Sequence, residues 1–326
     1  GDRLRIAVGC ITRRRPEGLR RLLRSFAEME RPEGAEIEFL VCENDEVSRG
    51  LGVVEAFRAA VSEPVQLMLE PRKGIPFARN RVLAAALEQG FDFLTFVDDD
   101  EIVQPDWLVR MLAAVEKRRL DLAAGPVPPI APPERLTRLQ KMVLQELQKR
   151  FRAGEQARAR TGRADEGADV EAFTGNWCLR LAAARRMGVI RFDETTAESG
   201  GEDSVCSRDM RAAGARIGWV PEAVAEEVQP AMRLTLSYIY RRNRDHQMNK
   251  MMMNGRPVAK RLSFLAKRSL EVVLLTLLLP VFLVVRPANR GKLVFSAARK
   301  AGKIAGAFGN LLGRRSRHYA ASADRL

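Results

Sequence analysis

The sequence predicts an α/β fold with a mostly parallel central sheet flanked by helices. Over the first half of the chain, short apolar runs alternate with segments of helical periodicity, as in strands joined by crossover helices. One of these runs ends in three consecutive aspartates, at the position where open α/β sheets bind ligands. The chain has 326 residues, of which 46% are hydrophobic and 29% charged. This is enough for one large domain and an appendage.

The predicted strands are short apolar runs. They cover residues 4–11, 37–42, 65–69, 91–97 and 120–125. Between them, apolar positions recur at helical spacing, first after Pro16, which suits the first turn of a helix. Similar periodicity marks residues 53–61, 77–87 and 107–115. This order predicts a doubly wound, nucleotide-binding sheet.

A proline-rich stretch at residues 126–133 interrupts the alternation. A polar, arginine-rich segment follows, and we interpret residues 131–170 as a helical and loop insertion over the mouth of the active site. A solvated charged helix is the alternative interpretation. Order resumes with a strand within 173–180, a helix at 204–213 and a strand at 215–220. The catalytic domain is therefore expected to span residues 1–230.

Residues 231–326 are predicted to form a helical, basic and apolar region that associates with a membrane. Residues 270–285 are almost continuously apolar but fall short of the roughly 20 residues that cross a bilayer. A second apolar stripe, with lysines and arginines around it, fits a helix lying in the membrane interface. The stripe consists of Ala297, Ala301, Ile304, Phe308 and Leu311. Alternatively, both segments pack on the catalytic domain or form a homo-oligomer.

The charge of the chain indicates an anionic partner. The net charge is +14 and the pI about 10.3, which fits nucleic acid, an acidic membrane or a phosphate-bearing substrate. Since no recognised nucleic-acid motif is present, we do not expect nucleic acid as the partner. Four scattered cysteines and two histidines support neither a zinc site nor disulfides. The chain does not open with a secretory signal pattern, so we expect a reducing, cytoplasmic location.

The three aspartates Asp98, Asp99 and Asp100 are the first candidate site. Carboxylates this close repel one another unless a cation or a donor-rich ligand lies among them. Hard divalent ions, with diphosphate substrates, suit such oxygen ligands. The alternative is a solvated acidic turn, in which Asp100 or Glu101 favours the N-terminal dipole of the next helix. The triplet by itself leaves both interpretations open.

Seven segments together resemble the inverting, nucleotide-sugar-dependent glycosyltransferases of family 2, which have the GT-A fold. They are residues 10–16 (CITRRRP), 42–45 (CEND), 74–80 (GIPFARN), 98–100 (DDD), 174–176 (TGN), 201–203 (GED) and 220–222 (VPE). Within the family, the chain looks closest to bacterial exopolysaccharide glycosyltransferases of the succinoglycan type or to glycolipid glycosyltransferases. The resemblance therefore implies a GT-A catalytic domain.

The resemblance also implies a donor site. Asp100 is the implied metal ligand, for Mn²⁺ or Mg²⁺, and Asp98 the contact to the nucleoside, while Asp99 could share either role. Further positions match those where the family holds the nucleotide. These are Thr12, Glu43, Asp45 and Arg79. From the residue types alone, Thr12 could instead cap the first helix, and Arg79 could be a surface residue.

The catalytic base implied by the family is Asp203, with Glu202 as the second choice. A structural alternative is a carboxylate at a helix N-terminus, worth less than about 1 kcal/mol. That alternative does not explain the preceding pair Gly200 and Gly201, which allows close approach of backbone and ligand. The acceptor site is expected to include Asn176 and Trp177, although a buried tryptophan beside a strand is more often part of the core.

The chain departs from the family pattern at two places. Many members carry a metal-binding histidine shortly after the Val-Pro-Glu segment, where this chain has Glu226 and Glu227. Glu227 is therefore expected to serve as an oxygen ligand of the metal. The chain also lacks the tryptophan of the processive members' motif. Arg241 and Arg242 lie there, and they are expected either to neutralise the donor diphosphate or to face anionic lipid.

The expected function is transfer of a sugar from a UDP-sugar to a lipid-linked or glycolipid acceptor. The location expected is the cytoplasmic face of the inner membrane, with peripheral or monotopic attachment, in synthesis of surface polysaccharide or glycolipid. The nearest rival is a nucleotidyltransferase, but residues 9–15 are a poor match to a glycine-rich, lysine-containing phosphate loop. A binding module for anionic membranes or nucleic acid, without catalysis, is a second rival.

Overall fold

The computed structural model describes residues 3–160, 172, 175–197, 200–253, 263, 266 and 290–313. The chain divides into two compact units. The first combines Gly1–Pro129 with Arg152–Val228, and the second combines Ile130–Phe151 with Gln229–Arg325. The apolar run predicted at 270–285 and Thr174 of the predicted TGN segment lie outside the described residues.

The first unit contains a seven-stranded sheet of strand order β3-β2-β1-β4-β8-β6-β9. Its strands are β1 (Leu4–Thr12), β2 (Ala35–Glu43), β3 (Val65–Leu69), β4 (Phe93–Val97), β6 (Leu122–Ala124), β8 (Asn176–Arg180) and β9 (Ile217–Trp219). All neighbours pair in parallel except β8, which is antiparallel to both β4 and β6. The predicted α/β fold with a mostly parallel sheet is confirmed.

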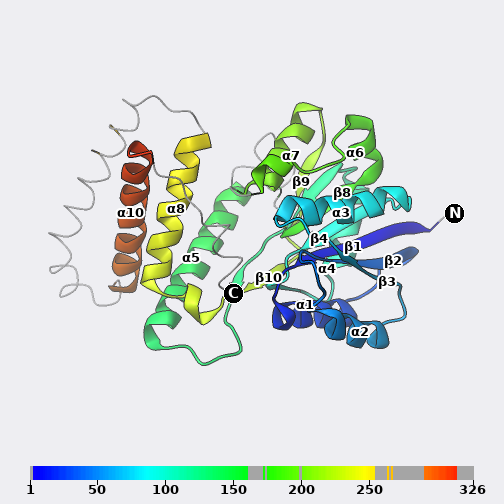
Figure 1. Ribbon diagram of the computed structural model, residues 1–326, viewed down its shortest axis with the longest axis horizontal. Coiled ribbons are helices and arrows are strands. Elements are labelled where there is room, and N and C mark those ends of the chain that lie inside the picture. The colour runs from blue at the N-terminus through cyan, green and yellow to red at the C-terminus, as the bar shows by residue number, and fades with distance from the viewer. Residues whose placement is uncertain are drawn as a thin grey trace. The chain divides into compact units, whose positions relative to one another are not determined.

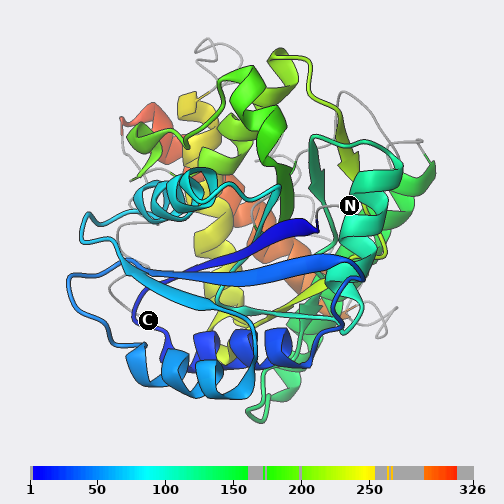
Figure 2. The ribbon, with the colours of Figure 1, turned by 90° about the vertical axis from the view of Figure 1, so that its right-hand side faces the viewer.

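Helices cover both faces of this sheet because successive side chains of a buried strand point to opposite sides. In β1, Ile6 and Val8 belong to one hydrophobic core and Ala7 to the other. The first core packs against α1 (Pro16–Glu28), α2 (Leu51–Ala60) and α4 (Trp107–Lys117). The second packs against α3 (Ile75–Glu88), α6 (Leu181–Met187) and α7 (Glu202–Ala212). Figure 2 shows α1 and α2, in blue, along one face of the sheet and α3, in cyan, along the other.

A second, three-stranded sheet of order β5-β10-β7 was not predicted from the sequence. Its strands are β5 (Glu101–Val103), β10 (Ala225–Val228) and β7 (Pro129–Ile130). They are very short, and β5 and β10 carry glutamates, so no apolar alternation reveals them. β5 and β10 are antiparallel, and their register places Glu101 directly opposite Glu227. Two carboxylates far apart in the chain thereby become neighbours.

The second unit is helical. Its helices are the first part of α5 (Arg138–Arg160), α8 (Leu236–Met253) and α10 (Arg290–Leu311). Two short 3₁₀ helices are also described: η1 (Glu194–Thr196) in the first unit and η2 (Ala231–Arg233) in the second. α8 and α10 run side by side (Figure 1). Among the helices that the structure describes, none is long and apolar enough to cross a membrane.

Two glycines allow α10 to lie against the backbone of α8. A Cβ atom at Gly302 would lie 2.3 Å from the Tyr240 carbonyl oxygen, and one at Gly306 would lie 2.1 Å from that of Arg244. We therefore expect Gly306→Ala to destabilise the second unit by about 1–3 kcal/mol, the usual cost of overpacking. Chemical denaturation followed by circular dichroism measures this loss.

Gly154 provides the matched control for that substitution. It lies in α5, and a Cβ atom added there would meet nothing within 4 Å. Gly154→Ala is expected to leave stability unchanged or to raise it by up to about 1 kcal/mol, since alanine favours the helix. Equal stability of the Gly306→Ala variant and the wild type would contradict the close helix contact.

Candidate active site

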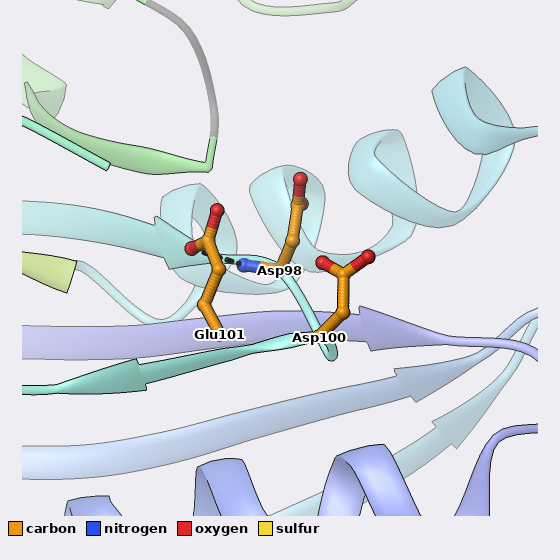
Figure 3. A group of neighbouring side chains, drawn as sticks. All are labelled: Asp98, Asp100 and Glu101. Atoms are coloured by element: carbon orange, nitrogen blue, oxygen red, sulfur yellow. Dashed lines mark hydrogen bonds between the residues drawn. The ribbon is translucent and has the colours of Figure 1, made fainter. Parts of the chain in front are cut away.

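The aspartate triplet follows β4 directly and reaches the edge of the sheet where the parallel strands end. Asp98, Asp100 and Glu101 each offer a carboxylate oxygen, and these oxygens lie within 4.8 Å of one another. Figure 3 shows the three carboxyl groups projecting to the same side of the turn between β4 and β5. The turn after β4 therefore gathers three carboxylates at one point.

Glu101 is held at this point by its surroundings. Only 4% of its surface is exposed, and its Oε2 accepts a hydrogen bond of 3.1 Å from the Asp98 backbone amide. A Cβ atom at Gly175 would lie 2.5 Å from Glu101 Oε1, so glycine leaves room for the carboxylate. Burial, and after it the nearby Asp98 and Asp100 carboxylates, raise the pKa of Glu101 well above its usual value.

Glu227 lies on the strand beside this cluster but is not one of the three residues whose carboxylate oxygens gather within 4.8 Å. It faces Glu101 across the β5–β10 pair, and its charge also raises the pKa of Glu101. The Val228 amide donates a 2.8 Å hydrogen bond to the Asp100 carbonyl, which ties β10 to the triplet. Like charges directly opposite on paired strands repel. This set of oxygen ligands fits a hard divalent cation such as Mg²⁺ or Mn²⁺.

Arg79 connects the triplet to the start of α7. It lies in α3 and is only 4% exposed. Its Nη2 donates to Asp98 Oδ1 at 3.1 Å, and its Nη1 donates to Glu202. Glu202 is equally buried, and burial raises the pKa of its carboxyl group while Arg79 opposes that shift. The alternative that Arg79 is a surface helix residue is wrong, since the side chain forms a buried ion-pair network.

Asp203 is presented at the first turn of α7. Gly200 and Gly201 have φ of 72° and 94°, a conformation in which L-residues with side chains are strained. Gly201 is the N-cap, and the next two residues are Glu202 and Asp203. Glu202 points into the Arg79 network, whereas Asp203 is partly exposed and accepts a 2.8 Å bond from the Ser204 amide. Asp203 is therefore the carboxylate of this turn that an incoming molecule can reach.

The residues predicted to bind the nucleotide at the ends of β1 and β2 differ in their burial and in their hydrogen-bond partners. Thr12 is buried, and its hydroxyl donates to Asp99 Oδ2 at 2.8 Å. A hydrogen bond from Arg14 lowers the pKa of Asp45 to about 2. Glu43 is buried and accepts hydrogen bonds from the Ser48 hydroxyl and from the amides of the turn before α2. In this structure Glu43 stabilises that turn.

The predicted acceptor residues Asn176 and Trp177 begin β8 and are both buried. The Asn176 amide group accepts from the Trp107 indole nitrogen at 2.8 Å and donates to two backbone carbonyls, at 3.0 and 2.6 Å. Trp177 packs in the second core beside Phe96. These contacts fix the strand that borders β4.

Arg241 and Arg242 belong to α8 of the second unit and are exposed there. Their predicted roles toward the diphosphate or lipid stay predictions. Two residues near the triplet, Glu101 and Arg15, were absent from the predicted site. Glu101 directly follows the triplet, and Arg15 closes an arginine run, so the sequence contained a signal for both. The sequence did not show in which direction each of these side chains points.

Comparison with known sequences identifies the family. The model of glycosyl transferase family 2 matches residues 8–175, and that of glycosyl transferase family group 2 matches residues 93–297. The succinoglycan biosynthesis protein ExoM of Rhizobium meliloti (strain 1021) is 33% identical over 241 residues, 74% of this chain and 72% of ExoM. The chain belongs to glycosyl transferase family 2. The resemblance carried by the seven segments is confirmed.

Solved structures of glycosyltransferases share the fold. The mannosyltransferase PcManGT from Pyrobaculum calidifontis, in complex with GDP-Man and Mn²⁺, has a TM-score of 0.63 at 16% identity and covers 96% of this chain and 88% of its own. TarS of S. aureus, residues 1–349 in complex with UDP-GlcNAc, has a TM-score of 0.53 at 15% identity, with 95% and 93% coverage. These likenesses confirm the predicted GT-A fold of this family 2 member.

Proposed function

We propose that this family 2 glycosyltransferase is an inverting, divalent-metal-dependent enzyme that transfers a sugar from a UDP-sugar to a lipid-linked or glycolipid acceptor. One observation carries the proposal: Arg79 binds both Asp98, at the carboxylate cluster, and Glu202, beside Asp203. A cation site and a candidate base are thereby held on two sides of one arginine. The alternative function, a nucleotidyltransferase, is not supported, because the chain belongs to glycosyl transferase family 2.

The proposed reaction divides its tasks among the residues of this network. Asp203 accepts the proton of the acceptor hydroxyl, whose oxygen forms the new bond to the anomeric carbon as the bond to the diphosphate breaks. Attack from the side opposite the leaving group inverts the configuration at that carbon. Asp100, Glu101 and Glu227 would hold Mg²⁺ or Mn²⁺, and Asp98, which the resemblance assigned to the nucleoside, would join them because its carboxylate lies in the same cluster. When bound, the metal supplies positive charge that stabilises the departing diphosphate.

The donor and the pathway are inferred from the relatives. TarS binds UDP-GlcNAc, and ExoM is a succinoglycan biosynthesis protein, which together support a UDP-sugar and a role in exopolysaccharide synthesis. PcManGT binds GDP-Man and Mn²⁺, which supports the metal and makes GDP-sugars the natural comparison. Thr12, Asp45 and Asp99 lie at the strand ends from which we propose contacts to the nucleotide.

A screen of nucleotide sugars tests this function. The full chain is incubated with UDP- and GDP-sugars, with and without Mn²⁺, and thermal stabilisation and hydrolysis are recorded. Stabilisation by a UDP-sugar that requires Mn²⁺ is expected. NMR of the product formed on a membrane extract then reports the anomeric configuration. Preference for GDP-sugars would overturn the donor assignment, and retention of configuration would overturn the inverting mechanism.

We further propose that α10 attaches the protein to the anionic, cytoplasmic face of the inner membrane. Ile304 and Phe308 each lie two residues from Gly306, about 200° around the helix from the side packed on α8. Phe308 is 57% exposed. The chain carries a net charge of +14, which favours an anionic surface. The homo-oligomer through these helices stays a prediction.

Phe308→Glu is expected to weaken binding to vesicles that contain anionic lipid by about tenfold or more, since burial of a phenylalanine side chain contributes about 1.5–3 kcal/mol. Co-sedimentation with such vesicles measures the binding. Val47→Glu is the matched control, because Val47 is similarly exposed but belongs to the first unit. Equal binding by the Phe308→Glu variant and the wild type would contradict attachment through this side of α10.

A further inference from the structure

Arg15 places a cation of the protein itself against the aspartate triplet. Its Nη1 lies 3.1 Å from Asp99 Oδ1 and 3.5 Å from Asp100 Oδ2. The side chain is 29% exposed, so one of its sides remains open to solvent. Asp100 is also one of the three residues whose oxygens gather within 4.8 Å. A single guanidinium group therefore bridges the buried Asp99 and a candidate metal ligand.

The backbone fixes Arg15 at this position. It is the N-cap of α1, and Pro16 follows at the first helical position. In the first turn of α1, a Cβ atom at Gly18 would lie only 2.4 Å from the Asp99 carbonyl oxygen, so the turn rests on the backbone of the triplet. Thr12, at the other end of the loop, donates its hydroxyl to Asp99. The loop thus contacts Asp99 from both ends.

The remaining arginines of the loop are held by a different strand. Arg14 has a φ of 56°, an uncommon conformation for a residue with a side chain, and its Nε donates to Asp45 Oδ2 at 2.8 Å. Arg13 Nε donates to the Asn44 carbonyl at 3.2 Å. Both partners follow the end of β2. Strained backbone persists only where its surroundings hold it in place, and these two bonds do so here.

We propose that Arg15 is a counter-ion of the aspartate triplet and that a divalent cation displaces it from Asp100. Positive charges this close repel each other. The guanidinium and the cation therefore compete for the same carboxylate. The bond to Asp99 retains Arg15 beside the site after displacement, where its freed donors can pair with the diphosphate of the donor. This inference rests on the proposed metal-dependent function and assigns Arg15 as a donor-binding residue within it.

The proposal predicts opposite effects of Arg15→Gln on the two ligands. Mn²⁺ alone should bind about tenfold more tightly to the variant, since coupling of this kind typically changes affinity between about 5- and 150-fold. UDP in saturating Mn²⁺ should bind about tenfold more weakly, because the arginine is missing. Arg15→Lys keeps the charge and should lie between the variant and the wild type in both measurements. A variant that merely loosens the loop would weaken both ligands.

Titration of the full chain with Mn²⁺, with free Mn²⁺ followed by electron paramagnetic resonance, measures the first effect. Calorimetric titration with UDP measures the second. Arg13→Gln is the control, with the same loss of charge in the same loop, and should bind Mn²⁺ as the wild type does. Unchanged or weaker Mn²⁺ binding by Arg15→Gln would overturn this inference alone. A wild-type protein that binds no Mn²⁺, with or without UDP, would overturn the metal dependence and this inference together.

Discussion

Asp203→Asn is expected to reduce sugar transfer by about 10²–10⁴-fold, the usual contribution of a general base. Asparagine has nearly the same shape but cannot accept the proton of the acceptor hydroxyl. Since Asp203 is partly exposed and its hydrogen bond from the Ser204 amide can also be accepted by the asparagine side-chain oxygen, the fold should survive the change. Initial rates at saturating donor measure the loss, and binding of UDP with Mn²⁺ should remain as in the wild type.

Asp209→Asn is the matched control for that experiment. Asp209 lies on the same helix and is exposed, so the same chemical change there should leave transfer unaffected. Transfer at the wild-type rate by Asp203→Asn would refute the assignment of the base. Glu202 would then be the carboxylate to test, although it is buried and paired with Arg79, so an acceptor hydroxyl reaches it less readily.

The second large effect is expected for Asp100→Ala, which should abolish measurable Mn²⁺ binding and reduce transfer by about 10³-fold. Metal ions contribute several kcal/mol to such reactions, and each 1.36 kcal/mol corresponds to a factor of ten. The hydrogen bond between the Val228 amide and the Asp100 carbonyl belongs to the backbone, so alanine preserves it. Mn²⁺ titration and initial rates check the two parts separately.

Asp106→Ala is the control for the loss of a carboxylate near β5. Asp106 is the N-cap of α4 and pairs with Arg110, away from the triplet. Wild-type affinity for Mn²⁺ in the Asp100→Ala variant would refute its role as a ligand. Because Arg15 and Asp100 are paired, the two substitutions should also change Mn²⁺ affinity in opposite directions.

Much of the site could be predicted from the sequence, because it lies at the ends of regular strands. The apolar run before Asp98 identified β4, and parallel strands bring their carboxyl ends to one edge of a sheet. The family resemblance assigned Thr12 and the triplet to one donor site, and their hydrogen bond shows that they meet. Glu101 was assigned only to a turn or a helix start, since β5 and β10 are too short to show alternation.

The sequence by itself determined the family, the α/β fold and the position of the acidic triplet at a strand end. It did so because apolar periodicity and the order of the motifs are local properties of the chain. Only the tertiary structure decided that Glu101 opposes Glu227, that Arg79 is buried between Asp98 and Glu202, and that Arg15 lies on Asp99 and Asp100. The partner of a charged side chain is set by non-local packing, since burial makes an unpaired charge costly and so selects its neighbours.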